Sequence, residues 1–97
     1  MVINILDHVK TASTYEDGEV IYKLISDAFR KNENVILSFN AITSVPSAFI
    51  NSALVRLLED FSFNQIRDMI TFINTTKHIN ELIRSRFTFV LSKKQSV

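Results

Sequence analysis

Four polar residues are the strongest candidates for recognition or chemistry, namely Ser44, Ser47, Asn51 and Arg56. Ser47 follows Pro46, which favours the first turn of a helix because proline has no backbone N–H to lose there. A hydroxyl at that position can bond a free backbone amide, and a phosphate added to it would be favoured by the positive end of the helix dipole. Ser47 is therefore a candidate modification site, with a plain helix-start serine as the alternative.

Asn51 lies one helical turn beyond Ser47 in the sequence. Because open α/β sheets collect their binding sites at the carboxyl ends of strands, we expect its amide to face a ligand or partner beside the loop at residues 40–44. Asparagine also bonds readily to nearby backbone, so a packing role is the alternative. Together with Ser44 and Arg56, these residues predict a partner or switch surface.

Other catalytic and metal-binding chemistries find no support in the residue types. The chain has no cysteine, which excludes disulfides, thiolate metal sites and a cysteine nucleophile. One glycine is too few for a phosphate-binding loop. The two histidines, His8 and His78, lack the ligand spacing of a zinc site. We therefore predict a protein that is not an enzyme and that has no catalytic residue, no cofactor and no metal.

The last third of the chain is basic and aromatic, and it supplies an alternative function. Its cations are Lys77, Arg84, Arg86, Lys93 and Lys94, and its rings include Phe87 and Phe89. Basic residues interleaved with aromatic rings are typical of nucleic-acid surfaces. Phenylalanines also suit a core, and basic residues suit the end of a helix. A small nucleic-acid-binding or inhibitory protein is thus the alternative to a protein-binding module.

The overall composition predicts one small globular domain over residues 1–97. Of its 97 residues, 46% are hydrophobic and 22% charged, which suits a single core. The formal charge of +1 gives no strong global field to attract nucleic acid or an anionic membrane. No secretory signal and no apolar run of about 20 residues is evident. We expect a cytoplasmic protein with no membrane partner, and homo-oligomer formation stays open.

Three short apolar runs predict the strands of a small sheet. They occupy residues 2–6, 35–39 and 69–73. The second run is apolar almost throughout, which is typical of a strand covered on both faces, so we expect it at the centre of the sheet. Residues 62–67 predict only a connection before the third strand.

Amphipathic patterns predict three helices. Thr14 with Asp17 matches the pattern of a capping box at the start of the first helix, and Ser13 with Glu16 matches it one residue earlier. Gly18, the only glycine, falls in its first turn, where close approach of another backbone is the best explanation. The second helix has Pro46 in its first turn and ends near residues 60–61.

The third helix starts after Asn74 or Thr75, and two interpretations exist for its later part. Residues 86–91 alternate like a strand but also continue the apolar helical face, and we favour the helix. Residues 92–97 are polar and predict a frayed tail. The resulting β-α-β-α-β-α order predicts a layered α/β domain, with helices packed on a short mixed sheet whose strands are at least partly parallel.

The stretch Val35–Asn51 resembles the core of a bacterial STAS-like domain family that long carried only an unknown-function label. The resemblance rests on the apolar strand ending in Phe39, the loop after it, and Ser-x-Phe-Ile-Asn at the start of the next helix. Glu16-Asp17-Gly18 at a helix start and Phe72-Ile73-Asn74 at a strand end also fit, so the likeness covers most of the chain. The family usually has an aspartate before the strand's phenylalanine, where this chain has Ser38.

The resemblance implies a small STAS-like module for protein interaction and regulation. STAS domains proper resemble anti-sigma factor antagonists, in which a partner kinase phosphorylates a serine at the start of the second helix. The nearest positions in this chain are Ser44 and Ser47. The implied partner is a protein such as a sensor or a kinase-like ATPase.

Overall fold

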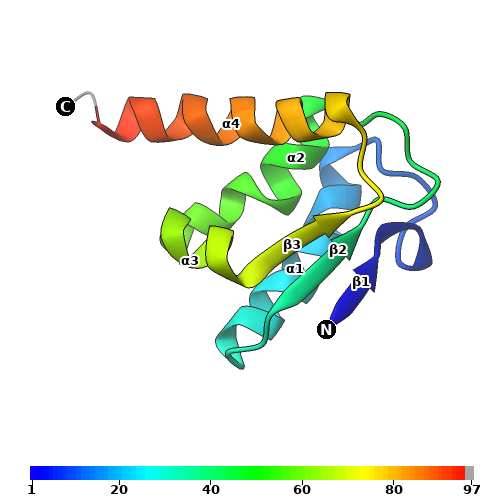
Figure 1. Ribbon diagram of the computed structural model, residues 1–97, viewed down its shortest axis with the longest axis horizontal. Helices are drawn as coiled ribbons and strands as arrows, with labels where there is room; N and C mark the ends of the chain where they lie inside the picture. Colours follow the sequence, from blue (N-terminus) through cyan, green and yellow to red (C-terminus); the bar gives the residue numbers. More distant parts are fainter. Residues whose placement is uncertain (96–97) are drawn as a thin grey trace.

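Three parallel strands form the sheet on which the helices pack (Figure 1). The computed structural model describes residues 1–95, with side chains as far as Lys93, and its strands are β1 (Val2–Asn4), β2 (Val35–Ser38) and β3 (Ile70–Ile73). Their order is β1-β2-β3, so the expected central strand is confirmed. Both pairs are parallel rather than mixed, because each connection contains helices that return the chain to the starting end of the sheet.

Four α-helices and two 3-10 helices complete the described part of the chain. The α-helices are α1 (Tyr15–Arg30), α2 (Ser47–Ala53), α3 (Phe63–Met69) and α4 (Lys77–Gln95), and the 3-10 helices are η1 (Ile5–Asp7) and η2 (Val55–Glu59). In Figure 1, α1 lies behind the sheet and α4 runs along the top. Helix α2 packs closely on α1, whereas α4 packs on α2 and η2. The expected α/β architecture of helices packed on a short sheet is therefore present.

Helix α3 lies where the sequence predicted only a connection. Ser62 caps it, since its hydroxyl accepts a hydrogen bond from the backbone N–H of Gln65 at 3.1 Å. The helix is only about two turns long and buries Ile66 alone, so no apolar repeat could reveal it. At the other end of the chain, residues 5–6 form part of η1 instead of extending the first strand.

The predicted second helix is divided into α2 and η2. Pro46 is the residue before the helix, and Ser47 is its first helical residue. Leu54 interrupts the helix with φ −120° and ψ −53°, after which the chain continues as η2. Leu54 and Leu57 are both fully buried. Their spacing of three residues fits a 3-10 turn as well as an α-helix, which is why the sequence pattern predicted one continuous helix.

Helix α4 runs through residues 86–91, which confirms the favoured interpretation of that segment. It continues to Gln95, into the segment 92–97 for which the sequence predicted a frayed tail, and residues 96–97 lie outside the described part. Lysine and glutamine are good helix formers, and polarity alone does not end a helix. The start differs from the prediction, because Thr76 Oγ1 accepts the hydrogen bond from Ile79 N–H at 3.1 Å.

Gly18 allows α1 and α2 to pack in close contact. A Cβ at this position would lie 2.8 Å from the carbonyl oxygen of Phe49 and would overlap the side chain of Ser52. Gly18 is itself buried. The predicted close approach of another backbone is therefore confirmed.

The capping box predicted at the start of α1 is present. The N–H of Asp17 donates to Thr14 Oγ1 at 3.0 Å, and the N–H of Thr14 donates to Asp17 Oδ2 at 3.1 Å. The Ser13 N–H and the Thr11 hydroxyl donate to the same carboxylate oxygen. The hydrogen bond from the Ser13 backbone is the largest cause that lowers the pKa of the Asp17 carboxyl, and desolvation partly opposes it.

Gly18→Ala should destabilise the protein, although alanine is the better helix former by up to about 1 kcal/mol. The added Cβ has no room unless α2 shifts, so we expect the free energy of unfolding to fall by about 1–3 kcal/mol in urea denaturation. The loss should shrink in a Ser52→Ala background, where the nearest obstructing atom is gone. Lys23→Ala, at an exposed position of α1, is the control and should change little. A Gly18→Ala protein as stable as the wild type would contradict the described packing.

Asp17→Asn should flatten the pH dependence of stability. A lowered pKa means that the Asp17 carboxylate stabilises the folded protein above the ordinary aspartate pKa of about 4, and this contribution is lost as the pH falls through the lowered value. Urea unfolding from about pH 3 to 7 should therefore show a smaller loss on the acid side for the variant than for the wild type. Lys23→Ala, at an exposed position of α1, removes no carboxylate and should keep the wild-type profile. Superimposable profiles for Asp17→Asn and wild type would rule out this contribution.

Candidate functional site

The structure divides the four predicted site residues into two pairs. Asn51 and Arg56 both line an open groove of about 330 Å³ between α1, α2, η2 and α4. We call it the Arg56 groove, and its other lining residues are Tyr15, Val55, Leu58, Glu59 and Val90. Ser44 and Ser47 are exposed but do not line this groove. The structure therefore brings Asn51 and Arg56 to one groove and leaves the two serines outside it.

Asn51 is held by the last helix. Its Oδ1 accepts a hydrogen bond from Arg86 Nε at 3.0 Å, which joins α2 to α4. The guanidinium of Arg86 also lies 4.8 Å from the centre of the Phe89 ring. Asn51 thus has the packing role that the sequence left as the alternative, and it contributes to the wall of the groove as well.

Arg56 is fixed in place by residues of α1 and η2. Its guanidinium lies 4.5 Å from the centre of the Tyr22 ring, its Nη1 is 3.4 Å from Glu19 Oε2, and its Nε is 3.9 Å from Glu59 Oε1. The side chain remains 33% exposed. An arginine held in this way can contact a partner with little further loss of conformational freedom.

Tyr15 and Val90 are groove residues that the sequence did not indicate as site residues. Tyr15 is the first residue of α1 and is 46% exposed, while Val90 lies near the end of α4. No local pattern links them, since they meet only because α4 passes beside the start of α1. The one sequence feature that could have indicated this part of the groove was Tyr15, an aromatic residue at the start of a helix that does not belong to the apolar face of that helix.

The loop between β2 and α2 presents Ser44 to solvent. Ile42 and Val45 are buried and anchor the loop on the core. The hydroxyl of Thr76 donates to the carbonyl oxygen of Thr43 at 3.2 Å, which ties the loop to the start of α4. Ser47, the first residue of α2, is also exposed. Neither serine side chain makes a hydrogen bond within the described residues, so both hydroxyls are accessible.

Ser38 connects two strands at their carboxyl ends. Its Oγ accepts hydrogen bonds from Asn74 Nδ2 at 2.9 Å and from the N–H of Asn40 at 3.2 Å. Its neighbour in the sheet register is Asn4, whose buried Oδ1 has no hydrogen-bond partner among the described residues. Ser38 therefore has a structural role at the position where the resembling family usually has aspartate.

The basic and aromatic residues of the last third lie on α4, but they do not form one surface. Phe87 is buried and packs on Phe63, with ring centres 5.5 Å apart, so it is unavailable for stacking on a base. Phe89 is 46% exposed, and Arg86 and Lys93 lie 4.8 and 4.6 Å from its ring centre. The side chain of Lys94 is outside the described part. One exposed ring between two cations is what the structure provides for the alternative function.

No three metal-ligating side chains among the described residues gather closely enough to hold an ion. None of the helices in the described part is both long and apolar enough to cross a membrane.

The family model for the STAS-like domain of unknown function (DUF4325) matches residues 17–80, which is more than half of the chain. The chain belongs to this family. The STAS-like match contains α2 and all four candidate residues, whereas β1 and most of α4 lie beyond it. No curated protein matches the chain, and no solved structure does. The STAS-like assignment therefore brings the fold family with it but no specific role.

Asn51→Ala and Arg86→Ala should show non-additive effects on stability. The two single variants lose the same hydrogen bond between α2 and α4, so the double variant has no further bond to lose. A double-mutant cycle by urea unfolding should give a coupling energy of about 1 kcal/mol. Arg84 is the matched control on α4, and the Asn51→Ala/Arg84→Ala pair should be additive to within about 0.5 kcal/mol. Additivity of the Asn51/Arg86 pair would contradict this structural role.

Proposed function

We propose that this STAS-like domain is a non-enzymatic module that binds a protein partner through the Arg56 groove. The single observation that carries the proposal is the groove itself, in which a pre-positioned arginine lies beside the exposed Tyr15. Arginine and tyrosine are the residue types that most often dominate the energy of protein interfaces. The groove also contains the partly exposed apolar side chains of Leu58 and Val90, which a partner would remove from water.

The shape and charge of the groove support a protein partner more than a small ligand. Its volume of about 330 Å³ is at the lower end for ligand pockets, and the groove is open to solvent. Glu59, exposed at one side, and Arg56 give the surface charges of both signs, and such charges fix the orientation of a partner. The groove suits one or two side chains of a larger partner.

Ser44 and Ser47 supply the regulation in this proposal. Both are exposed, and Ser47 lies one helical turn before Asn51 on α2. A phosphate on either serine would add negative charge to the segment that leads into α2 and so change the binding of a charged partner. A sensor or a kinase-like ATPase is the class of partner implied by the family resemblance. The proposal includes a cytoplasmic location, which the cysteine-free sequence supports.

Nucleic-acid binding through α4 is the second candidate, because Phe89 is exposed between Arg86 and Lys93. Single-stranded nucleic acids stack on such rings and pair with such cations. The burial of Phe87 removes the second ring that this function would use. A mobility shift of labelled RNA or DNA that weakens with salt, and that Phe89→Ala abolishes, would support it over the protein-binding proposal.

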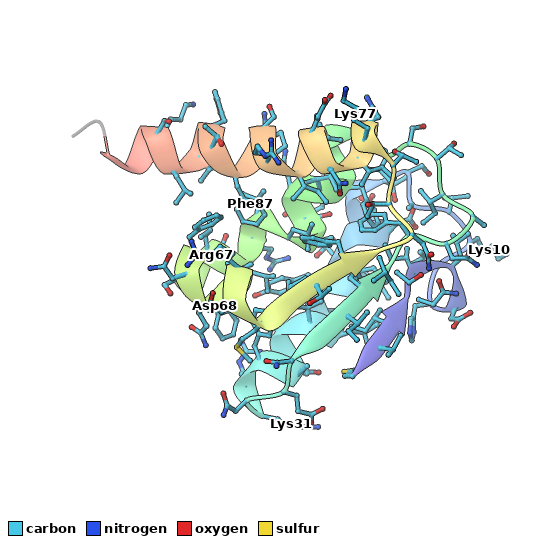
Figure 2. All side chains as sticks on the ribbon, viewed as in Figure 1. Lys10, Lys31, Arg67, Asp68, Lys77 and Phe87 are labelled. Carbon is cyan, nitrogen blue, oxygen red and sulfur yellow. The ribbon has the colours of Figure 1, made fainter. Side chains whose placement is uncertain are left out.

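A photo-crosslinking amino acid placed at Tyr15 should capture the partner in native cells. Position 15 lines the Arg56 groove, whereas Lys31 lies at the other end of α1 and is the control position (Figure 2). We expect a discrete protein adduct at position 15, absent at position 31, with mass spectrometry identifying the partner. Ser47→Asp should change its yield because it adds negative charge to the segment that leads into α2.

The charge of Arg56 provides the matched comparison for this experiment. Arg56→Glu should lower the adduct yield about tenfold, while Lys31→Glu makes the same charge change and should leave the yield unchanged. Circular dichroism establishes that both variants are folded. Equal adducts at positions 15 and 31, or an adduct indifferent to Arg56→Glu, would defeat the proposal.

A further inference from the structure

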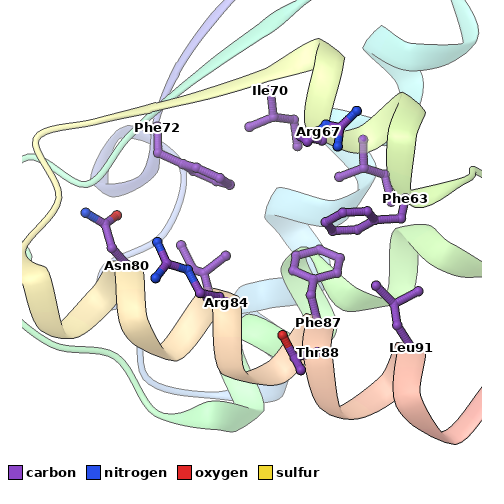
Figure 3. A pocket seen from close by; sticks show the side chains of 11 residues that line it. Phe63, Arg67, Ile70, Phe72, Asn80, Arg84, Phe87, Thr88 and Leu91 are labelled. Carbon is purple, nitrogen blue, oxygen red and sulfur yellow. The ribbon is translucent and has the colours of Figure 1, made fainter.

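A second and larger groove lies on another face of α4, between that helix, α3 and β3 (Figure 3). Its volume is about 520 Å³, and most of its wall is apolar, including three phenylalanines, Phe63, Phe72 and Phe87. The rings of Phe63 and Phe87 lie 5.5 Å apart, so they join α3 to α4 in this wall. We call this the β3 groove. A mostly apolar groove with a few polar side chains at its rim is the usual form of a binding site.

The β3 groove runs beside an unpaired strand edge. Strand β3 is the last in the sheet, and the carbonyl of Ile73 accepts a hydrogen bond from Phe39 N–H on the β2 side. Main-chain groups of successive residues point to opposite sides of a strand, so the N–H and C=O of Phe72 point away from β2. No hydrogen bond within the described residues uses them. Such an edge can accept an additional strand.

Helix α4 borders this edge without pairing with it. It packs on α2 and η2, and in Figure 3 Asn80 and Arg84 project from it across the groove towards Phe72. Hydrogen-bonding side chains therefore face the strand edge across an apolar floor. An extended chain lying between them would meet main-chain groups on one side and polar side chains on the other.

The charged residues of the β3 groove are both arginines. Arg84 is exposed and forms no ion pair among the described residues. Arg67 pairs only with its sequence neighbour Asp68, at 3.5 Å, and the two side chains are 62% and 69% exposed. Exposed pairs of this kind contribute little, so both guanidinium groups are available to a carboxylate. The groove is therefore complementary to an acidic occupant.

We propose that the β3 groove binds an extended acidic segment of a partner protein, which adds to the sheet as a fourth strand beside β3. Its backbone pairs with the N–H and C=O of Phe72. The side chains on the strand face turned to the groove pack against Phe63 and Phe72 and bring carboxylates to Arg67 and Arg84, while the side chains between them point to solvent. This surface is separate from the Arg56 groove, so the inference stands independently of the proposed function.

Selection from a displayed library of random decapeptides on the full chain tests the inference. Enriched peptides should carry apolar and acidic residues at every second position, with the positions between them unconstrained. They should bind the Arg67→Glu/Arg84→Glu variant about tenfold or more weakly than the wild type. Lys23→Glu/Lys31→Glu makes the same charge change on exposed positions away from the groove and should leave affinity within about twofold.

Strand addition has a readout of its own at residue level. On binding of a selected peptide, hydrogen exchange at the Phe72 amide should slow about tenfold or more, because that N–H gains a partner. The Thr71 amide is the internal control, since it points to β2 and is already paired in the sheet. N-methylation removes a backbone N–H donor. Methylation of alternate peptide residues should therefore abolish binding when the methylated N–H groups are those that face β3, and it should leave binding intact when they are those that face away.

Three outcomes would overturn the inference. The first is that no selected peptide binds the wild type more tightly than it binds the Arg67→Glu/Arg84→Glu variant. The second is that the enriched peptides contain no acidic residues. The third is that hydrogen exchange at the Phe72 amide is unchanged in the complex. Binding of dodecanoate in the groove without peptide enrichment would also overturn it, because a lipid-like anion uses the apolar wall and one arginine but leaves the strand edge unpaired.

Discussion

The contact between Gly18 and the Phe49–Ser52 turn of α2 sets the position of the candidate site. A Cβ at position 18 would overlap Ser52, so the two helices pack at a distance that only glycine permits. Phe49, in this turn, is fully buried and faces the core, which leaves Asn51 to face the Arg56 groove. Because α1 also carries Tyr15, any shift of α2 away from α1 would separate the two sides of this groove.

Helix α4 contributes to both the Arg56 groove and the β3 groove. Arg86 holds it to Asn51, and Phe87 packs on Phe63 of α3, so α4 is fixed from two sides. One face contributes Val90 to the Arg56 groove, and another contributes Arg84 to the β3 groove. Most of this helix lies beyond the segment that matches the family model. The two proposed binding surfaces thus combine the segment that matches the family model with a helix that lies mostly beyond it.

Local patterns in the sequence predicted the features that depend on near neighbours. The capping box of Thr14 and Asp17 and the three strand-length runs are of this kind, and Gly18 predicted a close approach because a helix rarely keeps a glycine without a packing reason. Helix α3 escaped prediction because two turns carry too few buried residues to show a period.

The candidate site could be predicted only in part. Asn51 and Arg56 are close in sequence, so the chain itself brought them together. Tyr15 and Val90 join them through tertiary packing, which no local spacing encodes. The β3 groove was not predicted for the same reason, since the sequence shows a third strand but not which of its edges stays unpaired.

Hydrogen exchange on the chain purified with its natural partner, compared with the chain alone, tests the central claim most directly. If the Arg56 groove is the docking surface, exchange should slow at the start of α1 and across α2 and η2, while the turn at residues 31–34 stays unchanged. A partner that bound with protection confined to other segments, and none in α2 or η2, would contradict the account.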